Sequence, residues 1–198
     1  MLMRIRGFSM VELMVVVALS VILMSVAVPS FQTWIRNAQI RATAESVQSG
    51  ARVAQAEALR LYQQVVLFRT DEANCSAAAT AAAAGKYWAV RTVPIAGGPA
   101  ARTVQCGTVA DAGSGITVNG PTALCFSAAG RLMAHAAPGV GAGAACVLAA
   151  AGTSSYDILG GTSAGTRPLR VIVALGGSVR MCDPAKVYGA DTPEGCPS

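Results

Sequence analysis

The sequence is poor in charge and in aromatic side chains. Only 13% of its 198 residues are charged and 5% are aromatic, whereas 53% are hydrophobic and the mean hydropathy is +0.49. A soluble domain usually carries about 25% charged residues. The composition excludes a disordered chain, which would combine low hydrophobicity with high net charge, and it argues against an ordinary cytosolic enzyme.

The chain also lacks the motifs of common enzymes and metal sites. It has one histidine, His135, and no CxxC pair, whereas zinc sites need clustered cysteine and histidine. It has no GxSxG elbow and no phosphate-binding loop, and the glycines of Gly141-Ala142-Gly143 have no strand before them and no helix after them. We therefore expect no enzyme activity, no catalytic residue, no metal and no cofactor, and we expect His135 to be an exposed loop residue.

Positive charge is present but scattered. The formal net charge is +5 and the pI is about 9.1. No run of Lys or Arg forms the basic patch that nucleic-acid binding needs. The net charge thus allows nucleic acid as a partner but does not favour it.

The hydrophobic excess is concentrated in one N-terminal run, from Phe8 to Val28. As a helix this run would span about 31 Å, and a bilayer core is about 30 Å thick. Arg4 and Arg6 precede it, so the positive-inside rule predicts a cytoplasmic N-terminus and an exported remainder. A cleaved signal peptide and a plain membrane anchor would both show this pattern.

Glu12 lies inside the apolar run and fits neither of those passive roles. An acid at the centre of a membrane helix costs about 2.5 kcal/mol or more, and less near the interface. An acid within a membrane segment is therefore a functional hypothesis by default.

The segment Gly7-Phe8-Ser9-Met10-Val11-Glu12, the apolar run and Pro29 resemble the N-terminus of type IV prepilins and type II secretion pseudopilins. The resemblance implies that a prepilin peptidase cuts between Gly7 and Phe8 and that the new N-terminal amine of Phe8 is methylated. The apolar segment then stays on the mature protein. Glu12, from the same chain or a neighbouring subunit, would neutralise the amine during assembly. Loss of residues 1–7 removes two arginines and lowers the formal charge from +5 to +3.

The helix is predicted to continue beyond the membrane. Pro29 lies where the chain would leave the bilayer and predicts a kink. Apolar residues then recur at spacings of three and four, which is typical of one helix face: Ile40, Ala44, Val47, Ala51, Ala54, Ala58 and Leu61. We expect one helix from Phe8 to about Tyr62, with residues 8–29 in the membrane or fibre core and residues 30–62 amphipathic.

From residue 63 the pattern changes to short β-prone runs separated by turn signals. Candidate strands lie at 65–68, 86–93, 102–109, 115–118, 124–127, 131–134, 146–149, 156–159, 169–175 and 178–182. Gly176-Gly177 fits a two-residue hairpin loop between the last two. In the penultimate run Leu169, Val171, Val173 and Leu175 alternate with Arg170, Ile172 and Ala174. The predicted fold class is α+β, with a long helix packed against an antiparallel β head, residues 63–198.

An even number of widely spaced cysteines in an exported chain predicts disulfides. The six cysteines allow fifteen pairings, and the closest pair in sequence, Cys182 and Cys196, is the first that we expect. The pairing of the others stays open: Cys75, Cys106, Cys125 and Cys146. The Ala- and Gly-rich segments 76–84 and 136–145 are expected to be loops that bury little area, held by the nearby Cys75 and Cys146.

A second resemblance involves both ends of the head. Ala51-Arg52, Ala56-Glu57-Ala58 and Arg60, together with Arg170-Val171-Ile172 and the segment from Gly177 to Pro184, resemble the GspH/FimT family of minor pilins and pseudopilins. This resemblance implies a β-sandwich-like head against the helix.

The two resemblances imply a structural protein: a minor pilin that primes or caps a type IV pilus. It would wait in the inner membrane as a single-pass protein with a periplasmic head and then enter the fibre. The implied partners are the prepilin peptidase, other minor and major pilins through helix packing, and the inner membrane. A minor pseudopilin of type II secretion is the alternative, because residues 1–35 have the same pattern in both systems.

Some FimT-like members bind DNA through a Gly-Arg-x-Arg motif in the last hairpin. Here the matching positions are Gly177, Ser178, Val179 and Arg180, and Ser178 replaces the first Arg. Loss of a phosphate contact lowers both the affinity and its salt dependence. Arg180 is therefore a candidate DNA contact for a second alternative, DNA uptake, while a solvated strand residue is the favoured interpretation.

Overall fold

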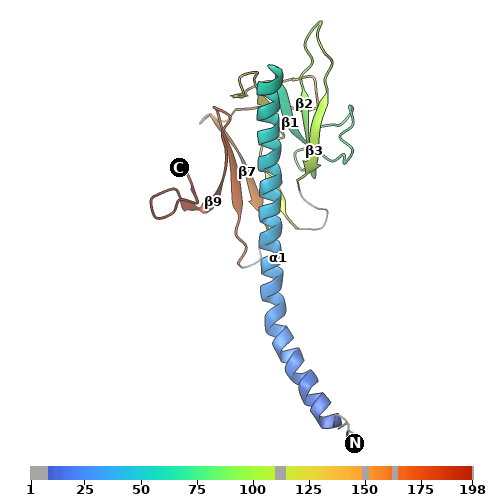
Figure 1. Ribbon diagram of the computed structural model, residues 1–198, viewed down its shortest axis with the longest axis vertical. Coiled ribbons are helices and arrows are strands. Elements are labelled where there is room, and N and C mark those ends of the chain that lie inside the picture. The colour runs from blue at the N-terminus through green and yellow to red at the C-terminus, as the bar shows by residue number, and fades with distance from the viewer. Residues whose placement is uncertain (1–8, 110–114, 149–151, 162–164, 198) are drawn as a thin grey trace, which may run out of the picture.

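The structure is a computed structural model that describes residues 9–109, 115–148, 152–161 and 165–197. These residues form one long helix, α1 (Met10–Leu61), followed by ten strands (Figure 1). The strands are β1 (Val65–Thr70), β2 (Tyr87–Thr92), β3 (Thr103–Thr108), β4 (Thr117–Asn119), β5 (Ala123–Phe126), β6 (Leu132–Met133), β7 (Thr153–Leu159), β8 (Leu169–Ala174), β9 (Val179–Val187) and β10 (Gly195–Cys196). This confirms the predicted α+β class.

Helix α1 is 52 residues long and lies on the head only with its C-terminal half, while its N-terminal half projects away (Figure 1). Six of the seven residues in the predicted apolar stripe are buried, namely Ile40, Ala44, Val47, Ala51, Ala54 and Ala58, and Leu61 is half-buried. The helix ends at Tyr62, whose left-handed φ of 49° turns the chain toward β1.

The backbone of α1 stays helical through position 29. The projecting half nevertheless curves away from the line of the upper half (Figure 1). The kink at Pro29 itself remains a prediction.

The strands form two five-stranded sheets, in the orders β3-β2-β1-β5-β6 and β10-β9-β8-β7-β4. Neighbours in the first sheet are all antiparallel, and in the second only the short β10 is parallel to its neighbour β9. Both sheets contact α1, which crosses in front of them (Figure 1). One main core therefore joins the helix and both sheets, and its largest side chains include Tyr156, Phe126 and Ile40.

Two local predictions were wrong. Cys146 forms only isolated bridges, with Ala123 and His135, so no strand begins there. The hairpin loop between β8 and β9 has four residues instead of two, 175–178. The Gly177 amide donates to the carbonyl of Ala174, and Gly177 has a φ of 88°, as a glycine after a turn allows.

A second, smaller core corrects the expectation that the Ala- and Gly-rich loops bury little. Ala79, Val140 and Ala144 from those loops pack on Val66 and Phe68, on the side of β1 that faces away from α1. The loops thus cover the outer face of the first sheet. Their small side chains suit this position because the backbone can lie close to the sheet.

Three disulfides join the six cysteines: Cys75–Cys106, Cys125–Cys146 and Cys182–Cys196. The last is the pair expected from sequence. Cys182 and Cys196 also pack with Ile172, on the face of β8 that turns away from the main core. The predicted alternation in β8 therefore holds for Leu169, Val171 and Val173, whereas Ile172 on the outward side is covered as well.

Candidate assembly surface

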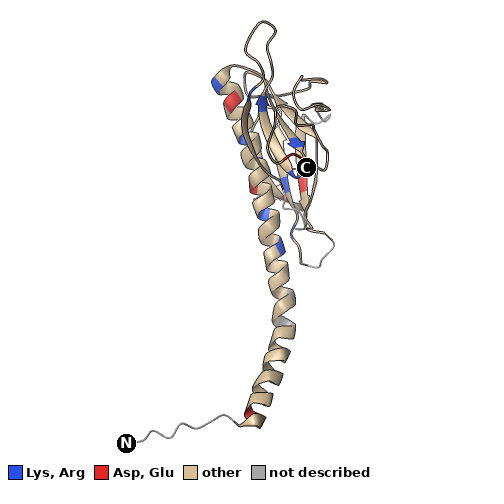
Figure 2. Cartoon of the chain, turned by 90° about the vertical axis from the view of Figure 1, so that its right-hand side faces the viewer, with Lys and Arg blue, Asp and Glu red and all other residues tan. Residues whose placement is uncertain are grey.

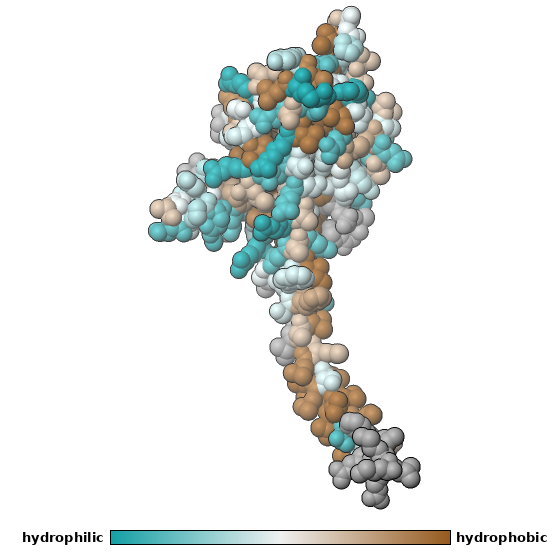
Figure 3. Space-filling model, in the orientation of Figure 1, coloured by the Kyte–Doolittle hydropathy of each residue, from teal (hydrophilic) through white to brown (hydrophobic). Residues whose placement is uncertain are grey.

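The N-terminal half of α1 exposes nearly all of its apolar side chains. The exposed large residues run from Met10, 83% exposed, to Ile35, 37% exposed. The described residues contain one helix, α1, that is long and apolar enough to cross a membrane. Its most apolar window has a mean hydropathy of 2.6. Figure 3 shows this half as a nearly continuous apolar rod below a mixed head. An apolar surface of this extent needs lipid or other protein to cover it.

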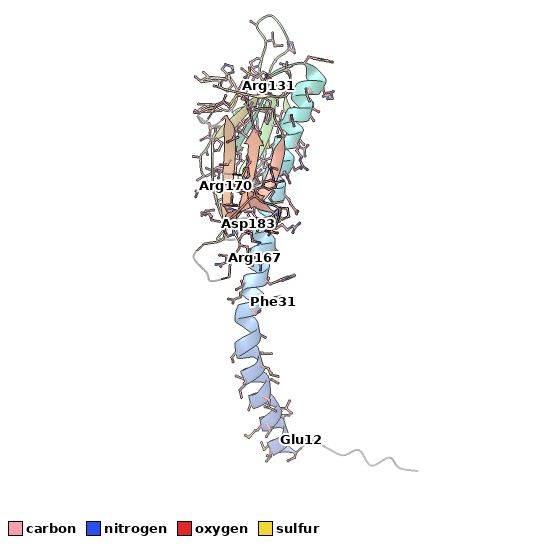
Figure 4. All side chains as sticks on the ribbon, turned by 90° about the vertical axis from the view of Figure 1, so that its left-hand side faces the viewer. Glu12, Phe31, Arg131, Arg167, Arg170 and Asp183 are labelled. Atoms are coloured by element: carbon pink, nitrogen blue, oxygen red, sulfur yellow. A yellow bond between two sulfur atoms is a disulfide. The ribbon has the colours of Figure 1, made fainter. Side chains whose placement is uncertain are left out.

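Glu12 is the one charged residue between Ser9 and Ile35. It lies in the first turn of α1 and is exposed, near the far end of the projecting half (Figure 4). Negative charge is favourable at a helix N-terminus because the backbone dipole is positive there. The structure therefore presents a single carboxylate at the tip of an apolar rod. Gly7 and Phe8 lie outside the described residues.

Two of the serines within the apolar half, Ser20 and Ser25, bond their hydroxyls to the helix backbone. Ser20 Oγ donates to the carbonyl of Val16 at 2.8 Å, and Ser25 Oγ donates to the carbonyl of Ile22 at 2.7 Å. Such bonds to the preceding turn remove the need for an outside partner. Among the side chains of this half, Glu12 alone carries an unshielded charge into an apolar environment.

Contacts at the base of the head set the boundary between the two halves. Asn37 Nδ2 donates to the carbonyl of Gly165 at 3.1 Å, and its Oδ1 accepts from the amide of Arg167 at 2.9 Å. Arg36 Nη1 donates to the carbonyl of Gly160 at 3.4 Å. Sequence reasoning missed these contacts because they join residues more than 120 positions apart.

Higher on the helix, a tryptophan joins α1 to the first sheet. Trp88 Nε1 donates to Ser46 Oγ at 2.9 Å, and Ser46 Oγ donates to the carbonyl of Thr108 at 2.5 Å. A Cβ on Gly50 or Gly107 would lie 3.0 Å or 2.5 Å from the Trp88 ring. The two glycines thus make the room that the indole occupies.

Gly177, which matches the glycine of the Gly-Arg-x-Arg motif, has a packing role in the structure. A Cβ there would lie 2.1 Å from the Gly130 carbonyl oxygen and 2.2 Å from Gln55 Nε2. Gln55 Nε2 itself donates to that carbonyl at 3.2 Å. The β8–β9 hairpin therefore docks on α1 through a position that only glycine fits.

Arg180 is exposed on β9, with its guanidinium carbon 5.3 Å from the centre of the Tyr188 ring. Nearby basic residues are engaged in ion pairs. Arg170 Nε donates to Asp157 Oδ1 at 2.5 Å across β7 and β8, and Lys186 Nζ donates to Glu194. The hydrogen bond from Lys186 lowers the pKa of Glu194. Two acids therefore offset part of the positive charge near Arg180, whose DNA contact remains a prediction.

A buried arginine holds the two sheets together. Arg69 on β1 is only 5% exposed. Its Nη1 donates to the carbonyl of Val118 on β4 at 2.8 Å. Burial lowers the pKa of Arg69 and raises that of Tyr156, which lies in the same region of the core. Both residues act as structural members of the core, since neither lies on the projecting half of α1.

Nothing in the described residues gathers into a metal site, because no three His, Cys, Asp or Glu side chains come together there. His135, expected to be exposed, is half-buried, and its Nδ1 lies 2.7 Å from Gln64 Nε2. Its backbone also bonds to Cys146. The expectation failed because the disulfide from Cys125 brings Cys146, and the loop with it, onto the sheet.

Comparison with known proteins bears on the N-terminus and the head separately. Residues 2–28 match the prokaryotic N-terminal methylation motif. No curated protein sequence gives a significant match. Among solved structures, the chain is similar to the type IV minor pilin FimU of Pseudomonas aeruginosa, with a TM-score of 0.48, 14% identity, and 79% of this chain and 94% of that one covered. It is also similar to the minor pseudopilin EpsH of the type 2 secretion system of Vibrio cholerae, with a TM-score of 0.46, 11% identity, and 75% and 99% covered.

The methylation motif thus lies on a chain that also has an exposed apolar half-helix and a β-rich head. The matched residues include the whole segment from Gly7 to Glu12 on which the sequence resemblance rests. The motif implies processing by a prepilin peptidase.

Proposed function

We propose that the chain is a minor pilin of the type IV pilus, of the GspH/FimT kind, which enters the fibre through its N-terminal helix and helps to start assembly. The observation that carries this proposal is the apolar, exposed half of α1 with the single carboxylate of Glu12 at its tip. Residues 8–29 form the membrane and fibre segment of this subunit, residues 30–62 the amphipathic half of the helix, and residues 63–198 the periplasmic head.

The chemistry of assembly rests on two charges. Cleavage between Gly7 and Phe8 leaves a positive amine on Phe8, which is then methylated, four residues before Glu12. An uncompensated charge in an apolar interior costs about 3–5 kcal/mol. A subunit that docks in the correct register pairs its carboxylate with an amine, whereas a subunit out of register leaves both charges unpaired.

The charge pair matters because an apolar surface by itself hardly distinguishes lipid from other helices. Lipid tails are as apolar as leucine side chains, so moving an apolar helix from lipid into a bundle gains little hydrophobic free energy. The remaining selectivity must come from packing and polar contacts. Glu12 is the one ionisable side chain on the exposed half-helix that can supply such a contact.

Glu12 and Glu45, which lie in different halves of α1, allow a matched test. In the full chain, Glu12→Ala should be cleaved, inserted and folded in the head like wild type, but it should be lost from sheared pili. Glu45→Ala is the control, because Glu45 lies on the head-bound half in an exposed pair with Arg41, 3.0 Å apart. It should enter pili at the wild-type level. Normal incorporation of Glu12→Ala would contradict the proposal.

The pilus and the secretion system are separated by a deletion strain. Loss of the gene should abolish or reduce pilus-dependent twitching and leave secretion of folded proteins unchanged. The reverse pattern would identify a type II secretion pseudopilin, which uses the same N-terminal helix. We assign no catalytic role to either form.

A further inference from the structure

Two aromatic residues on α1, Phe31 and Trp34, lie just below the base of the head and are called the aromatic pair here. They are 59% and 66% exposed, and their rings stack with centroids 5.8 Å apart and planes 22° apart. Figure 4 shows Phe31 on the projecting part of the helix, below Arg167. The other tryptophan, Trp88, is only 5% exposed. The head thus buries one indole and leaves the other largely exposed.

We infer that the aromatic pair docks in the periplasmic interface of the inner membrane and sets the depth at which the subunit waits before assembly. The inference deepens the proposed function and rests on its membrane-anchored form. Tryptophan is enriched at such interfaces because its ring is apolar while its N–H can bond to headgroups or water.

The length of the helix places the aromatic pair at this depth. At 1.5 Å per residue, Phe31 lies about 28 Å and Trp34 about 33 Å along the helix from Glu12. The hydrocarbon core of a bilayer is about 30 Å thick. When Glu12 lies at the cytoplasmic boundary, where an acid costs least, the aromatic pair lies on either side of the opposite boundary.

The surroundings of the aromatic pair also change from apolar to polar at this point. On the membrane side, Ala27 and Val28 border the same shallow surface as the pair. On the head side the next charged residue after Glu12 is Arg36. Figure 2 likewise shows charged residues along the head-bound part of α1 and few below it. The pair therefore marks the step from an apolar to a charged surface.

Charge near Trp34 argues for an aromatic rather than an electrostatic contact with lipid. Trp34 borders a groove at the base of the head that is also lined by Arg41, Arg167 and Lys186 and by the acids Asp183 and Glu194. Arg41 pairs with Glu45, and Lys186 pairs with Glu194. Because acids offset most of this positive charge, docking should depend little on anionic lipid.

The experiment measures the depth of Trp34 in the full chain, reconstituted in vesicles of phosphatidylcholine with or without phosphatidylglycerol. Lipids brominated at shallow or deep positions quench tryptophan fluorescence according to depth. The Trp34→Phe variant reports Trp88 alone, so its signal is subtracted from that of wild type. We expect Trp34 at about 18 Å from the bilayer midplane, just outside the boundary of the hydrocarbon core at about 15 Å, and at the same depth in both lipid mixtures.

A matched control uses Tyr62, which is 85% exposed at the other end of α1, about 42 Å farther along the helix. In a Trp34→Phe, Tyr62→Trp variant, the new tryptophan should be quenched by aqueous iodide and by neither brominated lipid. If Trp34 in the inserted protein is as open to iodide as this control, or lies near the midplane, the inference is wrong. Protection of Trp34 only after other pilins are added would assign the aromatic pair to a subunit contact instead.

The same preparation separates this inference from the proposed function. If an alkaline wash releases the chain from the vesicles, residues 8–29 do not span the membrane and both proposals fail. If the chain resists the wash while Trp34 stays in water, only the interfacial role of the aromatic pair fails.

Discussion

The two halves of α1 are equally helical and both apolar, yet they meet different surroundings. From Met10 to Ile35 the apolar side chains are mostly Val, Leu, Met and Ile, and they are exposed. From Ile40 to Ala58 the apolar stripe is mostly Ala and is buried to 5% exposure or less. Small side chains let two sheets approach the helix closely, whereas large ones present area to lipid or to other helices. Side-chain size, and not hydrophobicity alone, distinguishes the two faces.

Charge separates the halves in the same way. The first half carries Glu12 alone, while the second half carries charges on its outer face, among them the Arg41–Glu45 and Glu57–Arg60 pairs. Charges directed into solvent cost little, so the second half can hold many. A charge in the first half must have a specific use, and this is why Glu12 is informative.

The largest expected effect comes from placing the same new acid in each half. Ala54→Asp puts a carboxylate at a position that is 0% exposed, which should destabilise the head by about 3–5 kcal/mol. Val17→Asp should leave the unfolding of the head unchanged and impair membrane insertion instead, at a cost of about 3 kcal/mol. Thermal unfolding in detergent and an alkaline wash of membranes measure the two effects. Equal destabilisation of the head by both variants would contradict the difference between the two halves of α1.

A smaller effect is expected when an alanine is enlarged. Ala51 is 0% exposed under the sheets, so Ala51→Leu should overpack the core and lower the stability of the head by about 1–3 kcal/mol. Ala18→Leu, on the exposed half, should leave it unchanged. The midpoint of denaturant unfolding, measured by near-UV circular dichroism, compares the two variants. A fully tolerated Ala51→Leu would mean that close packing of the helix is not required.

Removing one polar contact should cost less again. Gln55→Ala deletes the hydrogen bond to the Gly130 carbonyl, which would lower head stability by about 1 kcal/mol. Gln32→Ala, on the exposed half, is the matched control and should have no effect on the head. Chemical denaturation of both variants in detergent gives the difference.

The smallest effect is a pH dependence confined to the second half. The hydrogen bond from Arg60 lowers the pKa of Glu57, so the pair stabilises the head above the unfolded-state pKa of about 4.3 and loses this contribution as the pH falls through the lower folded-state value. The contribution is small because the pair is partly exposed and is screened by salt. Unfolding of wild type and Glu57→Gln, compared between pH 7 and pH 3, should converge at the acid end. A gap that widens toward acid would contradict this sign.

Much of the fold could be predicted because its signals are local. The spacing of Ile40, Ala44 and Val47 predicted the buried helix face, and alternation predicted β8 with its inward Val171 and Val173. Eight other predicted runs coincide at least in part with strands. The false strand at Cys146 and the missed strand β10 both involve a disulfide-bonded segment, whose conformation depends on a partner far away in sequence.

The candidate site divides in the same manner. Glu12 and the apolar run were evident because a lone acid among apolar residues is anomalous at the level of sequence. The aromatic pair was not, since Phe31 and Trp34 look like any core residues until the head is seen to end above them. The wedge of Trp88 between Gly50 and Gly107 was equally hidden, because helix, β2 and β3 meet only in the folded chain.

By itself, the sequence determined a long helix with an apolar, nearly uncharged first half, a small-residue stripe in the second half, and a β-rich head with six cysteines. These properties follow from periodicity and composition within short windows. The tertiary structure alone decided the order of the strands in the two sheets, that Ala- and Gly-rich loops cover the outer face of one of them, and that the head stops short of Phe31. Those outcomes depend on contacts between residues distant in sequence, whose free energies no local pattern encodes.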